Sequence, residues 1–124
     1  MNKDDLTGRV IYCAIEVHKQ LGPGLLESTY EKCLQHELKV NNIIAKSQVV
    51  LPVKYKGLDI DAGYRLDILI PNQLIIELKS VEKLRPVYSA QILTYMKLAK
   101  IDKGLLINFN VRKLTDGLKR FNLP

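Results

Sequence analysis

The stretch that decides the fold reads Arg65-Leu66-Asp67-Ile68-Leu69-Ile70 and, after a short gap, Leu74-Ile75-Ile76-Glu77-Leu78-Lys79. Apolar runs of this length are typical of buried β-strands, yet both runs carry charged residues. An isolated charge inside a protein core costs roughly several kcal/mol, so chains keep such charges where they are paired or bind a metal. The pattern therefore indicates a metal site built into a β-sheet.

Side chains alternate between the two faces of a strand, which sorts the second run into two sets. We expect Leu74, Ile76 and Leu78 to face one layer, and Ile75, Glu77 and Lys79 the other. If the two runs pair as a hairpin through residues 71–73, Asp67 comes to lie beside Glu77. Two carboxylates beside an ammonium suit metal-assisted phosphodiester hydrolysis, because oxygen ligands bind hard divalent cations and Lys79 can orient a water.

The same residues resemble a known family. Asp67 followed by Glu77-Leu78-Lys79 resembles the motif of the PD-(D/E)XK nuclease superfamily, and Gln91-Ile92-Leu93-Thr94-Tyr95 resembles the QxxxY motif of its exonuclease-like branch. The stretch Gly24-Leu25-Leu26-Glu27-Ser28-Thr29-Tyr30 is similar to the motif that names the GxxExxY protein family, and the resemblance continues through 63–67 and 104–109. It covers nearly the whole chain.

This resemblance implies a restriction-endonuclease-like fold of the α/β class, with a mixed central β-sheet flanked by helices. It also implies a metal-dependent nuclease, with endonuclease or exonuclease action undecided. Mg²⁺ or Mn²⁺ would be held by Asp67, Glu77, the carbonyl of Leu78 and Glu27, with Lys79 as a further catalytic residue. The resemblance places four other residues in nucleic-acid binding or in support of the site: Gln91, Tyr95, Tyr30 and Arg65.

Simpler interpretations of these residues stay open at this stage. Asp67 is also explained by an ordinary ion pair with a neighbouring cation, and Glu77 and Lys79 by cross-strand pairs on a solvated face. Glu27 near a helix N-terminus is explained by the helix dipole alone. Glu31, four residues further along the same helix face, competes with Glu27 for its role. These interpretations predict a catalytically silent nucleic-acid-binding or protein-interaction module on the same fold.

The remaining pattern predicts an α-α-β-β-β-α-β order. Apolar residues recur at helical spacing from residue 6 to residue 21, before Gly22-Pro23-Gly24, and again from about residue 26 to residue 40. Strands are expected at 48–55, with Pro52 favouring an edge, and near 58–70 and 73–80. A third helix at 86–99 and a strand at 105–109 complete a right-handed parallel crossover. The tail after residue 111 is expected to add a short strand or helix.

Composition bounds the chain without selecting a function. The 124 residues suit one nuclease-like domain spanning 1–124, and a net charge of +6 favours a polyanionic partner, with DNA the expected one. A domain this small is also compatible with a homodimer that holds the substrate. The first residues lack an apolar signal core and no run is long enough for a membrane span, so we expect a cytoplasmic protein with no membrane partner.

Other residues able to carry chemistry are interpreted as structural. Cys13 and Cys33 lie in predicted helices without zinc-site spacing and are expected to be buried thiols. His18 stands alone before the glycine-rich turn. We assign it no catalytic role.

Overall fold

A five-stranded sheet forms the centre of the molecule, in the computed structural model that describes residues 3–124 with side chains from residue 5 onward. Its strand order is β1-β4-β5-β6-β7. The pair β5 and β6 runs parallel and the other neighbours run antiparallel. The strands are β1 (Lys46–Val50), β4 (Arg65–Ile70), β5 (Leu74–Lys79), β6 (Lys103–Asn108) and β7 (Leu118–Asn122).

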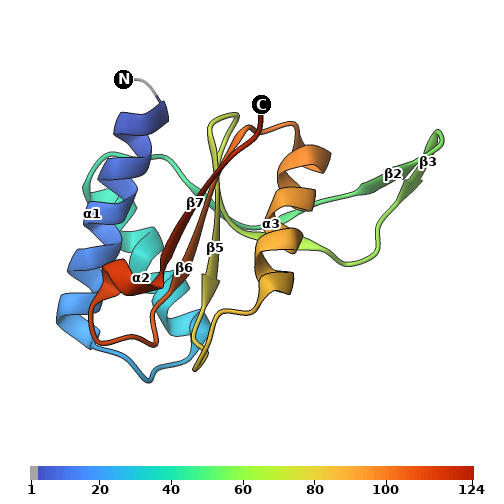
Figure 1. The fold of residues 1–124 in the computed structure, drawn as a ribbon. Coiled ribbons are helices and arrows are strands. Elements are labelled where there is room, and N and C mark those ends of the chain that lie inside the picture. The colour runs from blue at the N-terminus through green and yellow to red at the C-terminus, as the bar shows by residue number, and fades with distance from the viewer. Residues whose placement is uncertain (1–2) are drawn as a thin grey trace.

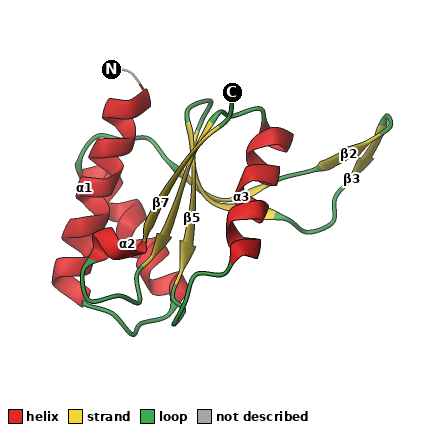
Figure 2. Cartoon of the chain, viewed as in Figure 1, coloured by secondary structure: helices red, strands yellow, loops and turns green. Residues whose placement is uncertain are grey.

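Helices cover both faces of this sheet. Helices α1 (Lys3–Leu21) and α2 (Glu27–Val40) lie on one face and α3 (Pro86–Ala99) lies on the other (Figures 1 and 2). Helix α3 connects the parallel strands β5 and β6, as the strand–helix–strand succession predicts. The expected α/β class, with a mixed sheet flanked by helices, is confirmed.

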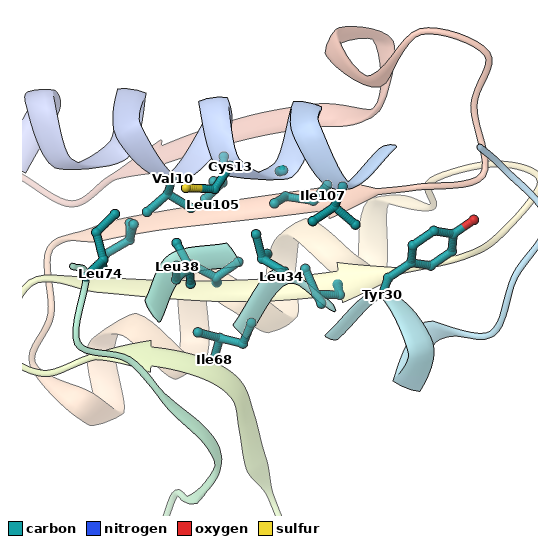
Figure 3. Close-up of a cluster of buried hydrophobic side chains, with 14 of the residues drawn as sticks. Val10, Cys13, Tyr30, Leu34, Leu38, Ile68, Leu74, Leu105 and Ile107 are labelled. Carbon is teal, nitrogen blue, oxygen red and sulfur yellow. The ribbon is translucent and has the colours of Figure 1, made fainter. Parts of the chain in front are cut away.

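Two apolar clusters hold the three layers together. The larger lies between the sheet and α1 and α2, where Val10, Leu34 and Ile107 are fully buried (Figure 3). The smaller lies under α3 and includes Ile92 and Met96. Burying each such side chain stabilises the fold by about 1.5–3 kcal/mol.

The faces of β5 follow the predicted alternation. Leu74, Ile76 and Leu78 pack in the cluster under α1 and α2, whereas Ile75 packs in the cluster under α3. By this alternation, Glu77 stands on the α3 side of the sheet.

Two of the predicted strands are wrong in their extent, because each one breaks. The strand expected at 48–55 divides into β1 and β2 (Val53–Tyr55) around Pro52, which cannot donate a backbone hydrogen bond. The strand expected at 58–70 divides into β3 (Leu58–Ile60) and β4 around a turn in which Gly63 has φ of +82°. Strands β2 and β3 pair only with each other and form a ribbon that projects beyond α3 (Figure 1).

Five strands therefore precede α3 where three were expected. The tail contains both expected kinds of element, a 3₁₀ helix (Leu114–Gly117) and strand β7. In the described part of the chain, the helices are too short or too polar to cross a membrane.

Candidate metal centre

The β4–β5 hairpin changes character at Asp67 and Glu77. Its backbone ladder extends from the Ile70–Leu74 pair to the Ile68–Ile76 pair. Beyond it, side chains take over: the Asp67 N–H donates to Glu77 Oε2 at 2.8 Å, and the Leu78 N–H donates to Asp67 Oδ2 at 2.8 Å. The hairpin thus brings the two predicted carboxylates together and fixes one oxygen of each.

Burial raises the pKa of both carboxylates and so disfavours the state in which both are ionised. Glu77 is 6% exposed. Desolvation and then the charge of Asp67 raise its pKa to about 8, against the opposing effects of the Asp67 N–H and the Lys79 ammonium. Burial also raises the pKa of Asp67, and the Leu78 N–H and Lys79 counteract it. A bound cation would remove the repulsion between the two groups.

Helix α2 begins at this centre and supplies a third carboxylate, Glu27. The Ser80 hydroxyl donates to the carbonyl of Leu25 at 2.6 Å, and the Ser80 N–H donates to the Glu27 carboxylate. Although Glu27 is exposed as a whole, desolvation and the nearby charge of Asp67 raise its pKa, while Lys79 and the Ser80 N–H lower it. Glu27 therefore interacts electrostatically with both Asp67 and Lys79.

Strand β1 contributes Gln48, which sequence analysis missed. By the β1–β4 register Gln48 stands opposite Asp67, and its φ of +53° is unusual for a residue within a strand. Its amide donates to Glu31 Oε1 at 2.8 Å and its side chain also hydrogen-bonds Asp67. An open pocket of about 530 Å³ lies between these residues, Glu27 and Ser28. Glu31 thus lies at the edge of the same pocket as Glu27.

Helix α3 lines the other side of the centre. Tyr95 is 7% exposed, and its pKa is raised by burial and then by the charge of Glu77. Its ring centroid lies 6.0 Å from that of Tyr64. Gln91 is half-buried one turn earlier on the same helix. The Lys79 ammonium lies 4.6 Å from the centroid of the Tyr88 ring.

Two of the predicted site residues contact neighbouring loops rather than the carboxylates. Tyr30 is fully buried against Phe109, and its hydroxyl donates to the Gly22 carbonyl and accepts the Leu25 N–H, so it fixes the loop before α2 and cannot touch a nucleic acid. Arg65 lies 3.7 Å from Asp61 and donates to the carbonyl of Tyr64, so its side chain is engaged with the loop before β4.

His18 and Cys13 are buried residues, in keeping with the structural role expected for them, whereas Cys33 differs from its prediction. His18 is buried and its Nε2 lies 2.7 Å from the carbonyl of Val111. Cys13 is buried as expected, whereas Cys33 is only half-buried.

Asn108 is a second supporting residue that sequence analysis missed. It is 2% exposed at the end of β6, where its Oδ1 accepts the N–H groups of Val81 and Asn110 and its Nδ2 donates to the Val81 carbonyl. These bonds hold the chain just after Lys79 and Ser80. A single amide after the apolar run Leu105-Leu106-Ile107 was the available signal.

A family model described as the PD-(D/E)XK nuclease superfamily matches residues 4–121. The chain belongs to this superfamily. Members of the PD-(D/E)XK superfamily are generally nuclease hydrolases that use divalent metals. Neither the curated proteins nor the solved structures include a significant match to this chain.

The donor set of this PD-(D/E)XK chain fits a magnesium-type ion. Among the side chains of residues 5–124, no group of three acidic, histidine or cysteine residues is placed to hold a metal ion. Mg²⁺ is usually bound through one or two carboxylates and keeps several waters, so it does not require such a group. The pair Asp67 and Glu77, whose pKa values are raised chiefly by burial, meets that requirement.

Proposed function

We propose that this chain is a metal-dependent nuclease that hydrolyses phosphodiester bonds of nucleic acid, with DNA as the substrate. One observation carries the proposal. The buried carboxylates of Asp67 and Glu77 meet where the β4–β5 ladder ends, and the Lys79 ammonium is close enough to influence the pKa of both.

In this proposal Asp67, Glu77 and the carbonyl of Leu78 would hold Mg²⁺ or Mn²⁺, and Glu27 would complete the site through water. The ion, when bound, would neutralise phosphate charge and acidify water near the scissile bond. The rise in the Glu77 pKa supports this assignment, because a cation can replace the proton that burial favours.

The protein's own groups then perform the remaining tasks. Lys79 orients the attacking water and offsets the charge that develops on the phosphate. Tyr95 and Gln91 line the α3 side of the centre, where a phosphate oxygen would need hydrogen-bond donors. Tyr30 contributes indirectly, by fixing the loop from which Glu27 begins α2. The net charge of +6 favours binding of a polyanion.

We also propose that the chain belongs to the GxxExxY branch of the superfamily. This proposal is supported by the distinct structural role of each of the three motif residues, Gly24, Glu27 and Tyr30. Gly24 has φ of +96°, Glu27 interacts with the centre, and Tyr30 ties the turn together through Gly22 and Leu25.

The test compares wild type, Glu77→Gln and the control Glu82→Gln, which changes an exposed carboxylate outside the centre. Binding of Mg²⁺ and Mn²⁺ is measured by calorimetry, and cleavage of linear, circular and single-stranded DNA is followed in parallel. We expect wild type and Glu82→Gln to bind metal and cleave, and Glu77→Gln to lose both activities. Circular DNA separates endonuclease action from a requirement for ends.

Two results would overturn the proposal. Metal and DNA binding without cleavage on any substrate, including RNA, would favour a catalytically silent nucleic-acid-binding module. Absence of metal binding in both wild type and Glu77→Gln would favour a structural or protein-interaction domain.

A further inference from the structure

Lys79 sits among three carboxylates without pairing directly with any of them. Its charge lowers the pKa of Glu27, Asp67 and Glu77 alike. In the described part of the chain, however, Lys79 has no carboxylate oxygen within ion-pair distance. Instead, the ammonium lies over the ring of Tyr88, 4.6 Å from the ring centroid. An aromatic face at this distance attracts a cation electrostatically.

Tyr88 is fixed by the first turn of α3 and by packing under that helix. Its N–H donates to the Arg85 carbonyl at 3.0 Å, next to Pro86 at the first turn of α3. The half-buried ring packs against the apolar cluster under α3. Tyr88 lies three residues before Gln91 and seven before Tyr95, so these side chains share one helix face toward the centre.

We propose that Tyr88 is the positioning residue for Lys79: its ring face holds the ammonium beside the Asp67–Glu77 pair and keeps it from collapsing onto either carboxylate. This inference rests on the proposed nuclease function. It assigns a role in that function to a residue outside both the ExK and the QxxxY patterns.

A direct ion pair would interfere with the centre in two ways. It would occupy carboxylate oxygens that are needed as metal ligands, and it would turn the ammonium away from the water it should orient. An aromatic face attracts the ammonium without supplying a metal ligand or removing its charge, so the ring keeps Lys79 available. Replacing the ring by an aliphatic side chain of similar burial should release Lys79 toward the carboxylates.

The placement of Lys79 is tested by NMR without any nuclease assay. Protein labelled with ¹³C at the lysine ε-carbons is compared as wild type, Tyr88→Phe and Tyr88→Leu, with the Lys79 signal assigned from Lys79→Met. A ring face shifts nearby protons upfield, so we expect an upfield Lys79 signal in wild type and Tyr88→Phe and its loss in Tyr88→Leu. Tyr55→Leu is the matched control, because it removes the ring that faces Lys56 at 5.4 Å in the projecting ribbon.

The consequence for chemistry is tested by single-turnover cleavage with saturating Mn²⁺. We expect Tyr88→Leu to lower the rate roughly tenfold, the range that a partly desolvated cation–π contact allows, with DNA affinity unchanged. Tyr88→Phe, which keeps the ring, and Tyr55→Leu should stay within about twofold of wild type. Circular dichroism and thermal unfolding confirm that each variant is folded.

Three results would overturn the inference: an unchanged Lys79 shift in Tyr88→Leu, a wild-type rate in Tyr88→Leu, or a Tyr88→Phe rate as low as that of Tyr88→Leu. The last would assign the effect to the hydroxyl group. If wild type cleaves nothing, the proposed function fails, and the Lys79 shift alone decides whether Tyr88 positions the ammonium.

Discussion

The closed end of the β4–β5 hairpin, at its turn, and the open end, at Asp67 and Glu77, belong to the same two strands and lie between the same helical layers. The two ends nevertheless differ in how their backbone groups are paired. At the closed end, Ile70 and Leu74 are 3% and 1% exposed and pair through the backbone. At the open end, the N–H groups of Asp67 and Leu78 donate to carboxylates instead. We infer that the closed end stabilises the fold. At the open end, backbone N–H groups bind carboxylates instead of carbonyls and so hold negative charge in place.

The largest effect should come from a cavity near the closed end. Leu74 is 1% exposed and packs in the cluster under α1 and α2, so Leu74→Ala should lower the free energy of unfolding by about 4 kcal/mol. Urea unfolding measures this loss. A cost below about 1 kcal/mol would show that this end does not carry the stability assigned to it.

The open end should instead make stability depend on pH. The folded-state pKa of Glu77 is about 8, above its ordinary value of 4.5. The contribution of this group to the free energy of unfolding is therefore complete below about pH 4.5 and is lost as pH rises through 8. For metal-free protein this loss is on the order of 3 kcal/mol. Unfolding at pH 5 and pH 9 should show it in wild type and not in Glu77→Gln. Added Mn²⁺ should restore stability at pH 9 in wild type only.

A smaller effect is expected where the open end is supported from β6. Asn108→Ala removes the hydrogen bonds that hold both backbone groups of Val81, so we expect a loss of about 2 kcal/mol in stability. Cleavage should also fall, because Lys79 and Ser80 lie on the segment that Val81 anchors. Thermal unfolding and single-turnover cleavage of one preparation measure both. Lower stability with an unaltered cleavage rate would show that Asn108 supports the fold but not the metal centre.

The smallest effect should come from the projecting ribbon, which belongs to neither end. Lys54 and Asp59 lie 3.9 Å apart with side chains 76% and 72% exposed. Solvent screens such a pair, so Lys54→Ala should change the free energy of unfolding by less than about 0.5 kcal/mol. A larger change in urea unfolding would mean that the ribbon contributes to the main fold.

Much of this comparison could be predicted from local pattern. Alternation assigned Leu74, Ile76 and Leu78 to one layer and Ile75 to the other, because each residue's face depends only on its own strand. The meeting of Asp67 and Glu77 followed from a hairpin with a short turn. Two expected strands were interrupted, one at Pro52 and one at the turn that contains Gly63. The apolar pattern alone does not tell whether a proline or a turn will end a strand.

The supporting contacts could not be predicted because they join distant segments. Gln48 reaches Glu31 across 17 positions and Asn108 reaches Val81 across 27. The left-handed conformation of Gln48 has no signal in its residue type, since only glycine, asparagine and aspartate favour it. The contact between Tyr88 and Lys79 depends on where α3 crosses the end of β5, which is set by packing against β6 at Gly104.

Lys79→Met tests the division between the two ends most directly, because methionine keeps much of the side-chain length and removes the charge. Cleavage is measured under single-turnover conditions at saturating Mn²⁺, alongside Mn²⁺ affinity and thermal unfolding. We expect Lys79→Met to fold and to bind Mn²⁺ as wild type does, with cleavage reduced at least about a hundredfold. Cleavage by Lys79→Met at the wild-type rate would contradict it.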